Sequence, residues 1–429
     1  MRFTRAGRSA ATSAQVADLA AFLTDHGVLE LRIGRSAVDE IRLELSDRQF
    51  LHLQSLGITT TPEVKLGELA ELTVVKASSW QEDYADKFQL KRFLDFRRPN
   101  GTIQVHTQDD EQAWVSVEFA RPLDIDAIQL RNVGNGAGPR ASSLRVSVRR
   151  GRRWTVVFDA TPLVAQVEQE AVDAAQPISA DEAAQLRGVV RDAFSGRYRE
   201  TQSAFDALSI GAGQKKLVKA VLNQQVLAVR KLEWTIHGPR RSFRYWTGAQ
   251  KKLYTHLAVT IAEELADLTP NVCFGFGAAL CVVRDGEFIP HDDDLDVIIG
   301  FEPHEATTLQ AGLRRVEDFL RARGYTVNGV YSAHRQVNWG GKAVDVFVGL
   351  FEGDTISWYP GPRGGLTRQT MFPPSEGRIY GIPVPLPHDP VTYLEDVYGP
   401  GWVNPNPDFR HAWDRSAYAD LRRAPKKSK

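Results

Sequence analysis

Four aspartates crowd into five consecutive positions, Asp292, Asp293, Asp294 and Asp296, directly before an apolar run. Carboxylates this close repel one another, so a purely structural role would cost stability. A hard divalent cation removes the repulsion, because Mg²⁺ prefers carboxylate oxygens and keeps waters and substrate phosphates as its remaining ligands. On a strand, Asp294 and Asp296 point to the same face. We therefore expect them to share a Mg²⁺ (or Mn²⁺) site, with Leu295 directed into the core.

A third carboxylate is expected from a neighbouring strand. Asp345 lies inside the otherwise apolar run 343–348, where a lone charge would be expensive. A calcium-binding EF-hand loop is the obvious competitor, but its glycine at position six is Val297 here and its glutamate at position twelve is Pro303. A solvated acidic turn remains as the structural alternative. We expect Asp294, Asp296 and Asp345 to be metal ligands and catalytic residues.

A glycine ahead of the aspartates fits the same chemistry. Gly277 follows a predicted strand and precedes a predicted short helix over 278–283. A small residue there lets backbone N–H groups approach a phosphate at the start of the helix. Arg284 is the nearest cation and could contact a phosphate in bidentate fashion. The alternative for Arg284 is a surface ion pair with Asp285 or Glu287.

The elements that must position these residues differ along the chain. Alternating apolar residues predict short strands in the first 160 residues, which favours an antiparallel β-sandwich of the jelly-roll type. The expected strands are 29–33, 41–45, 50–56, 102–106, 113–119, 125–131, 143–149 and 153–158. After Thr161 the pattern becomes helical, and Ser179 and Glu182 have the spacing of a capping box before a helix that runs to Phe194.

The chain therefore divides into four predicted parts. They are a β-sandwich over 1–160, a basic helical connector over 161–250, an α/β catalytic domain over 251–410 and a basic tail over 411–429. The segment from Gln214 to Lys252, at the end of the connector, holds ten Lys or Arg and one acid, Glu233. A solvated helix face with a linker is the simpler interpretation of this segment, and a surface that meets phosphate groups is the alternative. Alternating helices and buried strands in the third part imply a mixed sheet with flanking helices.

Composition bounds the class of protein. The 429 residues are too many for one ordinary core, and 53 basic residues balance 53 acidic ones. This balance argues mildly against a general nucleic-acid or membrane-surface binder. Two cysteines suggest a reducing compartment, and neither a secretory signal nor a membrane span is recognisable, so we expect a cytoplasmic protein. The end of the tail, 422–429, is expected to be solvated, with peripheral contact to an anionic membrane as the alternative.

Residues 273–299 and Asp345 resemble the LicD/fukutin-related family of nucleotidyltransferase-fold proteins. The family pattern runs Gly-Thr-Leu-Leu-Gly, an arginine, then Phe-Ile-Pro-Trp-Asp-Asp-Asp-Ile-Asp. Here it stands as Gly277-Ala-Ala-Leu-Cys281, Arg284, then Phe288-Ile-Pro-His-Asp-Asp-Asp-Leu-Asp296. The segments 371–374 and 393–402 are similar to the family's C-terminal elements, so the resemblance covers about 250–405. It departs from the pattern at His291, where the family has tryptophan, and at Ala278, where it has Thr or Ser.

This resemblance implies a polymerase-β-like sheet and a Mg²⁺-dependent phosphotransferase. Such enzymes move phosphocholine or an alditol phosphate from a CDP-activated donor to a hydroxyl of a cell-surface polysaccharide or its lipid-linked precursor. Gly277, Arg284, His291 and Asp293 are the expected substrate-binding residues, and Asp345 is the candidate for deprotonating the acceptor. No nucleic-acid partner is expected. The alternatives are a nucleotidyltransferase that uses an NTP on a sugar, protein or RNA, and a non-catalytic glycan-binding protein.

Two weaker signals complete the predictions. Residues 72–160 are similar to discoidin-like (coagulation-factor type C) domains, which are jelly rolls that often bind glycans. Trp80, Tyr84 and Phe88 could stack on a sugar there, although core or loop-anchoring aromatics are at least as plausible. His334 and Arg335 are expected between two strands, where they could meet a phosphate, with a surface turn as the favoured alternative.

Overall fold

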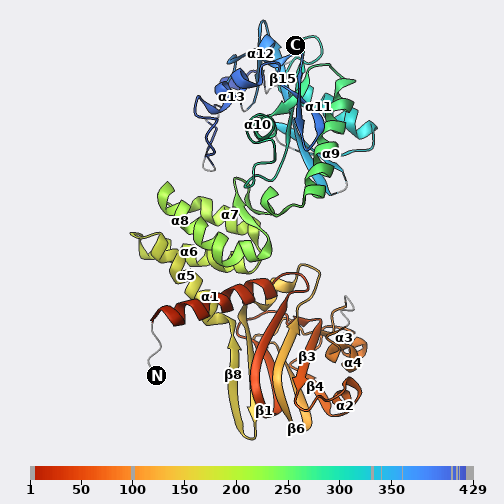
Figure 1. Cartoon of the computed structure of the whole chain (residues 1–429), viewed down its shortest axis with the longest axis vertical. Coiled ribbons are helices and arrows are strands. Elements are labelled where there is room, and N and C mark those ends of the chain that lie inside the picture. The colour runs from red at the N-terminus through yellow and green to blue at the C-terminus, as the bar shows by residue number, and fades with distance from the viewer. Residues whose placement is uncertain are drawn as a thin grey trace, which may run out of the picture. The chain divides into compact units, whose positions relative to one another are not determined.

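This computed structural model describes residues 5–97, 102–329, 333–339, 341–359, 361–406, 409–411, 414 and 416–421. The chain folds into two compact units, Met1–Arg240 and Arg241–Lys429, which we call unit 1 and unit 2 (Figure 1). The end of the predicted basic tail, 422–429, lies outside the described residues. Within the described part of the chain, no helix is both long enough and apolar enough to cross a membrane.

Unit 1 is built on a six-stranded antiparallel sheet in the order β3-β6-β1-β7-β8, with β4 also paired to β6. Its strands are β1 Val28–Leu45, β3 Ser55–Thr60, β4 Thr73–Ala77, β6 Trp114–Arg131, β7 Leu144–Arg150 and β8 Arg153–Asp159. The two central strands are 18 residues long each, so the short strands expected on either side of Gly34 and of Pro122 are continuous. Register shifts in β1 between Arg32 and Ser36 and between Val38 and Glu40 absorb the irregular residues.

The predicted jelly-roll sandwich is not confirmed. Among the described residues, the other sheet beside the six-stranded one in the β-rich part is the pair β2 His52–Leu53 and β5 Val105–His106. The aromatics Trp80 and Phe88 pack on each other with ring centroids 5.3 Å apart, and Tyr84 meets the ring of His106. These contacts fit a loop-anchoring role for the three aromatics, which is the alternative to stacking on a sugar.

Helices make up most of the remainder of unit 1. Their bounds are α1 Arg5–Phe22, α2 Leu66–Glu71, α3 Tyr84–Lys87, α4 Leu90–Leu94, α5 Ala160–Ala174, α6 Ala180–Phe194, α7 Tyr198–Ala207 and α8 Ala212–Leu222. A short hairpin of β9 Glu233–Thr235 and β10 Gly238–Arg240 ends the unit. The capping box is present as predicted, since Ser179 Oγ accepts from the backbone N–H of Glu182 and the Glu182 side chain accepts from the N–H of Ser179.

Unit 2 contains a seven-stranded mixed sheet in the order β11-β12-β15-β14-β13, extended by β16 and β17. Its strands are β11 Val272–Gly275, β12 Asp296–Phe301, β13 Thr326–Asn328, β14 His334–Trp339, β15 Lys342–Glu352, β16 Thr355–Trp358 and β17 Leu366–Thr367. Among the described strands β12 and β15 form the parallel pair, and the other neighbours are antiparallel. The predicted α/β character of this region is confirmed at the level of a mixed sheet with helices.

The helices of unit 2 are α9 Gly248–Ala266, α10 Phe276–Leu280, α11 Leu309–Ala322, α12 Arg368–Met371 and α13 Pro390–Tyr398, and a hairpin joins β18 Ser375–Ile379 to β19 Ile382–Leu386. Figure 1 shows α9 and α11 toward one side of β15 and α10 and α13 toward the other. Helix α11 buries Leu313, Val316 and Leu320. Its Gly312 permits a close approach to β15, because a Cβ there would stand 2.6 Å from Val348 Cγ1.

Candidate metal and phosphate site

Strand pairing brings two of the predicted carboxylates together. Asp296 is the first residue of β12 and lies directly opposite Asp345 in the parallel partner β15. The backbone N–H of Asp345 donates to the carbonyl of Leu295 at 3.0 Å, which fixes this register. On its other side Asp296 lies opposite Gly275, the last residue of β11, where a Cβ would stand 2.6 Å from Ile298 Cδ1. The two acids therefore meet at the N-terminal end of β12.

The third carboxylate comes from the loop before β12. Asp294 precedes the strand rather than belonging to it, yet one oxygen each of Asp294, Asp296 and Asp345 lie within 4.8 Å of one another. Leu295 between them is buried, as expected. Burial, together with the charges of Asp294 and Asp345, raises the pKa of Asp296 well above its ordinary value. A bound cation would stabilise the ionised form of Asp296 and offset the repulsion among the three carboxylates.

The donor set fits a magnesium ion. Three carboxylate oxygens at this spacing can reach one hard cation, and Mg²⁺ is commonly held by few carboxylates with waters or substrate phosphates completing its shell. Within the described residues this is the one group of three or more His, Cys, Asp or Glu side chains close enough to hold a metal. The side chain of Asp345 is 12% exposed, so its carboxylate is largely shielded from water.

One buried tyrosine joins the two segments that carry the acids. The hydroxyl of Tyr254, on α9, accepts from the backbone N–H of Leu295 at 3.1 Å and donates to the carbonyl of Ala343. It therefore connects the residue between Asp294 and Asp296 to a residue two positions before Asp345. Burial, followed by the charge of Asp294, raises the pKa of Tyr254, so the phenol remains protonated and able to donate. No local pattern in the sequence indicated this contact.

Side chains from β14 approach Asp345. His334 Nε2 lies 3.3 Å from Asp345 Oδ2, and Gln336 Nε2 donates to Asp345 Oδ1 at 3.5 Å. The prediction that His334 and Arg335 lie between two strands in the sequence is wrong, because both belong to β14. Arg335 is buried and pairs with Glu317 at 2.8 Å, so its guanidinium has a structural partner. His334 was considered for phosphate contact, whereas its position indicates that it orients a carboxylate.

The glycine turn ahead of the cluster is tightly built. Phe276 adopts a left-handed backbone with φ +43°, and its N–H donates to the buried hydroxyl of Tyr393 at 2.8 Å. A Cβ on Gly277 would stand 2.6 Å from Asp292 Oδ2. A side chain at position 277 would therefore displace the carboxylate of Asp292. The predicted helix over 278–283 is α10 Phe276–Leu280, followed by a π-turn over Cys281–Asp285.

The remaining predicted substrate contacts lie around this turn. Arg284 forms the ion pair that was its alternative, with Nη2 2.8 Å and Nε 2.9 Å from the carboxylate oxygens of Asp285, and Nη1 donates to the carbonyl of Trp402 at 3.3 Å. His291 and Asp293 are half-buried in the loop before β12, and the N–H of Asp293 donates to Asp292 Oδ1 at 3.0 Å. Contact of Arg284, His291 or Asp293 with a substrate remains a prediction.

An aromatic group that the sequence analysis missed lies near the acids. The rings of Tyr398, Phe409 and His411 have centroids 4.9–5.2 Å apart, and His411 is 5.4 Å from Phe276. Burial lowers the pKa of His411 to about 4. Burial, and then the charges of Tyr393 and Asp296, raises the pKa of Tyr398, which indicates that this ring lies close to the acidic group. We call Tyr398, Phe409 and His411 the aromatic trio.

Comparison with known proteins finds no family match and low similarity to parts of solved structures. No protein-family model matches the chain, and no curated protein matches it, so neither the LicD nor the discoidin resemblance gains support. Two solved structures of an aminoglycoside nucleotidyltransferase, ANT(2'')-Ia, are similar to part of it. A crystal structure with adenylyl-2''-tobramycin is 18% identical over 32% of this chain and 69% of that chain, with a TM-score of 0.24. A solution structure is 16% identical over 37% of this chain and 78% of that chain, with a TM-score of 0.26. Scores this low do not assign the chain to a family.

Proposed function

We propose that unit 2 is a metal-dependent transferase that moves a phosphorus-containing group from a nucleotide-activated donor to a hydroxyl group. The observation that carries this proposal is the convergence of Asp294, Asp296 and Asp345 within 4.8 Å at one end of β12. Such a set of carboxylates suits chemistry in which phosphate oxygens complete the coordination of a divalent cation. When bound there, Mg²⁺ would neutralise charge on the transferring and leaving phosphate oxygens.

The three carboxylates have distinct positions and therefore distinct proposed roles. Asp294 and Asp296 would hold the cation from the loop and from the start of β12. Asp345 would be its third ligand and would accept the proton of the attacking hydroxyl. His334 Nε2 and Gln336 Nε2 approach the two different oxygens of Asp345, so β14 fixes the plane of this carboxylate.

The donor would enter beside the turn at 275–277. Gly277 is needed for the close packing of Asp292 in this turn, and the aromatic trio offers ring faces on which the base of a nucleotide could stack. Arg284 would stabilise phosphate charge only if its guanidinium exchanged Asp285 for the substrate, because the pair engages Nε and Nη2. His291 and Asp293 would contact the donor group from the loop before β12.

Within this reaction class we propose a CDP-activated donor that carries phosphocholine or a phospho-alditol, with a hydroxyl of a cell-surface polysaccharide or its precursor as the acceptor. This narrower proposal is supported by the residues at 277–296 that resemble the LicD/fukutin-related pattern. Nucleotidyl transfer from an NTP uses the same carboxylates and is the alternative. The two differ in the phosphorus that is attacked and therefore in the product released.

Product analysis tests the proposal. The full chain with Mg²⁺ would be incubated with CDP-choline, CDP-glycerol or CDP-ribitol, and separately with each NTP, with and without candidate glycans. CMP release supports the phosphotransferase, and pyrophosphate release supports the nucleotidyltransferase. Asp294→Asn should abolish either product, whereas Asp318→Asn, at an exposed position on α11, should retain it. Absence of both products, or activity retained in Asp294→Asn, would overturn the assignment.

A further inference from the structure

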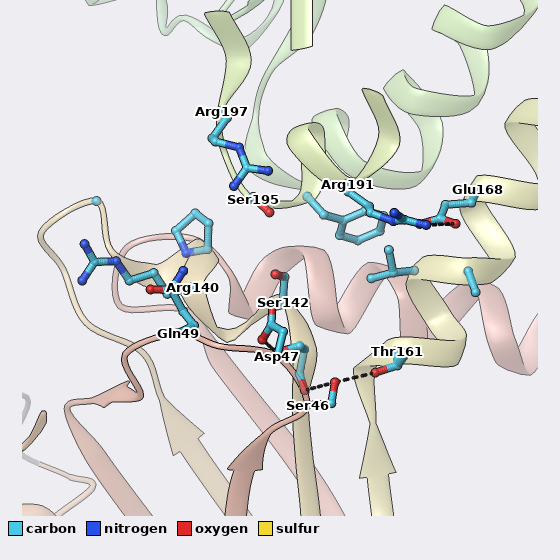
Figure 2. A pocket seen from close by; sticks show the side chains of 16 residues that line it. Ser46, Asp47, Gln49, Arg140, Ser142, Thr161, Glu168, Arg191, Ser195 and Arg197 are labelled. Atoms are coloured by element: carbon cyan, nitrogen blue, oxygen red, sulfur yellow. Dashed lines mark hydrogen bonds and ion pairs between the residues drawn. The ribbon is translucent and has the colours of Figure 1, made fainter. Parts of the chain in front are cut away.

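Unit 1 contains a cavity that the proposed transfer reaction does not use. Its volume is about 580 Å³, which is within the usual range of small-molecule sites. Its walls come from the loop after β1, from residues 136–143, and from α5, α6 and the residues that follow α6 (Figure 2). All of these segments belong to unit 1, so the cavity is formed within one compact unit.

The lining is rich in groups that recognise hydroxyl-bearing ligands. Five of the lining side chains are alcohols, at Ser46, Ser142, Ser143, Thr161 and Ser195. Each alcohol can donate and accept, while the carboxylates of Asp47 and Glu168 accept only and the lining arginines donate only. A ligand that satisfies such a surface must itself carry both O–H donors and oxygen acceptors. A sugar has this property, whereas an apolar ligand does not.

One side of the cavity is held in a fixed arrangement. The carboxylate of Glu168, 8% exposed, accepts from Arg191 Nε at 2.6 Å and from Nη2 at 3.2 Å. Figure 2 shows this pair at one side of the cavity, while Arg140 and Arg197 lie toward the other. A bidentate pair of this kind orients both groups without any ligand present, which lowers the entropic cost of binding.

The opposite side carries the charge of Arg140, because the charge of Arg197 is neutralised by Asp192, which is not part of the lining. Arg140 Nη1 lies 3.4 Å from His52 Nδ1. The Arg140 guanidinium lies 5.1 Å from the ring centroid of Phe50. Burial, and then the charge of Arg140, lowers the pKa of His106, which indicates that the positive potential of Arg140 extends into its surroundings.

From this arrangement we propose that the cavity binds a saccharide that carries a negatively charged group, either a phosphate or a carboxylate. Ser46 already bonds to Thr161, and the hydroxyl of Ser143 already donates to Asp47. The ring hydroxyls would therefore meet Ser142, Ser195 and the remaining acceptor positions of Asp47, and the anionic group would meet Arg140. This inference does not depend on the activity proposed for unit 2, because the acids of that site lie in the other unit. None of the aromatics Trp80, Tyr84 and Phe88 lines this cavity.

Isothermal titration calorimetry on the full chain tests the proposal. EDTA in the buffer removes divalent cations, so that phosphate groups do not report on the acids of unit 2. The probes are glucose 6-phosphate, glucuronate, glucose and inorganic phosphate. We expect the two charged sugars to bind and the other two probes to bind at least tenfold more weakly. Preference for glucose 6-phosphate or for glucuronate distinguishes a phosphate from a carboxylate as the natural anionic group.

Two variants and a control complete the test. Arg140→Gln removes the proposed anion contact and should weaken binding of the charged sugars about tenfold or more. Ala165→Trp places a large side chain at an exposed lining position of α5 and should abolish binding while α5 remains folded. Arg153→Gln, on β8 outside the lining, should bind as the wild type does. Binding of no probe, equal binding of inorganic phosphate and the sugars, or unchanged binding in both Arg140→Gln and Ala165→Trp would overturn the proposal.

Discussion

Asp296 and Asp345 are direct neighbours in the parallel pair β12 and β15. Neighbouring strands lie roughly 4.8 Å apart, so pairing these two positions forces their carboxylates together irrespective of side-chain preference. A shift of one residue in this register would turn one of the two acids to the other face of the sheet. The backbone thus supplies the energy that keeps like charges adjacent, and that arrangement is useful when a cation binds between them.

Gly277→Ala should impair activity through Asp292. The added Cβ would stand 2.6 Å from Asp292 Oδ2, so this carboxylate must turn away. We expect kcat/KM to fall, but by less than the about 10²-fold that a misplacement of about 1 Å at a reacting centre produces, because Asp292 is not one of the three proposed metal ligands. Gly248→Ala is the control in the same unit, since a Cβ there meets nothing within 4 Å. Equal activity in both variants would contradict the role of this turn.

Tyr254→Phe should affect both stability and catalysis. The change removes the hydroxyl that accepts from Leu295 and donates to Ala343, and leaves two backbone groups without that partner. A buried polar group left unsatisfied costs about 1–3 kcal/mol, so the free energy of unfolding should fall by that amount. Chemical denaturation measures this loss, and kcat should fall as well. Tyr325→Phe serves as the comparison and should change neither the free energy of unfolding nor kcat to this extent. A Tyr254→Phe protein with unchanged kcat would exclude a positioning role for the Tyr254 hydroxyl.

His334→Asn should weaken metal binding while leaving the fold intact. His334 Nε2 lies 3.3 Å from Asp345 Oδ2, and removing a group that orients a metal ligand typically costs about 10–100-fold in metal affinity. Titration of the protein with Mn²⁺, followed by electron paramagnetic resonance, reports the affinity directly. His304→Gln, at an exposed position before α11, provides the control. If both variants bind Mn²⁺ like the wild type, then His334 does not orient Asp345.

His52→Leu should reduce the sensitivity of unit 1 to acid. Burial, and then the charges of His106 and Arg140, lowers the pKa of His52 to about 3, whereas an unfolded histidine titrates near 6.5. Between these values the unfolded chain binds a proton that the folded chain does not, so the free energy of unfolding falls as the pH falls from about 6.5 towards 3. At pH 5 the wild type should have lost about 2 kcal/mol through this group.

The matching measurement is denaturation between pH 7.5 and 5. His52 Nε2 is buried without a hydrogen-bond partner among the described residues, and Nδ1 has a long contact of 3.4 Å with Arg140 Nη1. The leucine side chain of the variant should therefore be tolerated at pH 7.5, at the cost of that one contact. The variant should then lose less stability than the wild type on acidification. His256→Gln, at an exposed position on α9, should leave the pH dependence as it is in the wild type. A His52→Leu protein with the wild-type slope would show that this imidazole is not the sensitive group.

Part of this fold and site could be predicted because the evidence is local. The capping box of α6 depends on Ser179 and Glu182, which are three residues apart. The acid at Asp345 was recognisable because a charge interrupts an apolar strand, and Leu295 was recognisable as a core residue between two acids. In each case the physical cost of the residue in its immediate surroundings indicated its position.

The remainder depends on contacts between distant residues. Tyr254 lies 41 residues from Leu295, and Tyr393 lies 117 residues from Phe276, so only tertiary packing brings each hydroxyl to the backbone group that it bonds. Strand pairing was equally hidden. Alternation predicted most strands of the six-stranded sheet, but it missed β4 and did not indicate which strands pair. A six-stranded sheet formed where a two-sheet jelly roll was expected.

The central claim is that Asp294, Asp296 and Asp345 together hold a divalent cation, and Mn²⁺ titration of Asp296→Asn tests it most directly. Removing this charge relieves repulsion among the acids, so the variant should melt at the same or a higher temperature than the wild type without metal. The wild type should bind Mn²⁺ and gain thermal stability from it, and Mg²⁺ should displace the bound Mn²⁺. Asp318→Asn should behave in the same way. Asp296→Asn should lose this binding and fall at least 10²-fold in transfer activity. Wild-type Mn²⁺ affinity in folded Asp296→Asn, or no Mn²⁺ binding by the wild-type protein, would contradict the account.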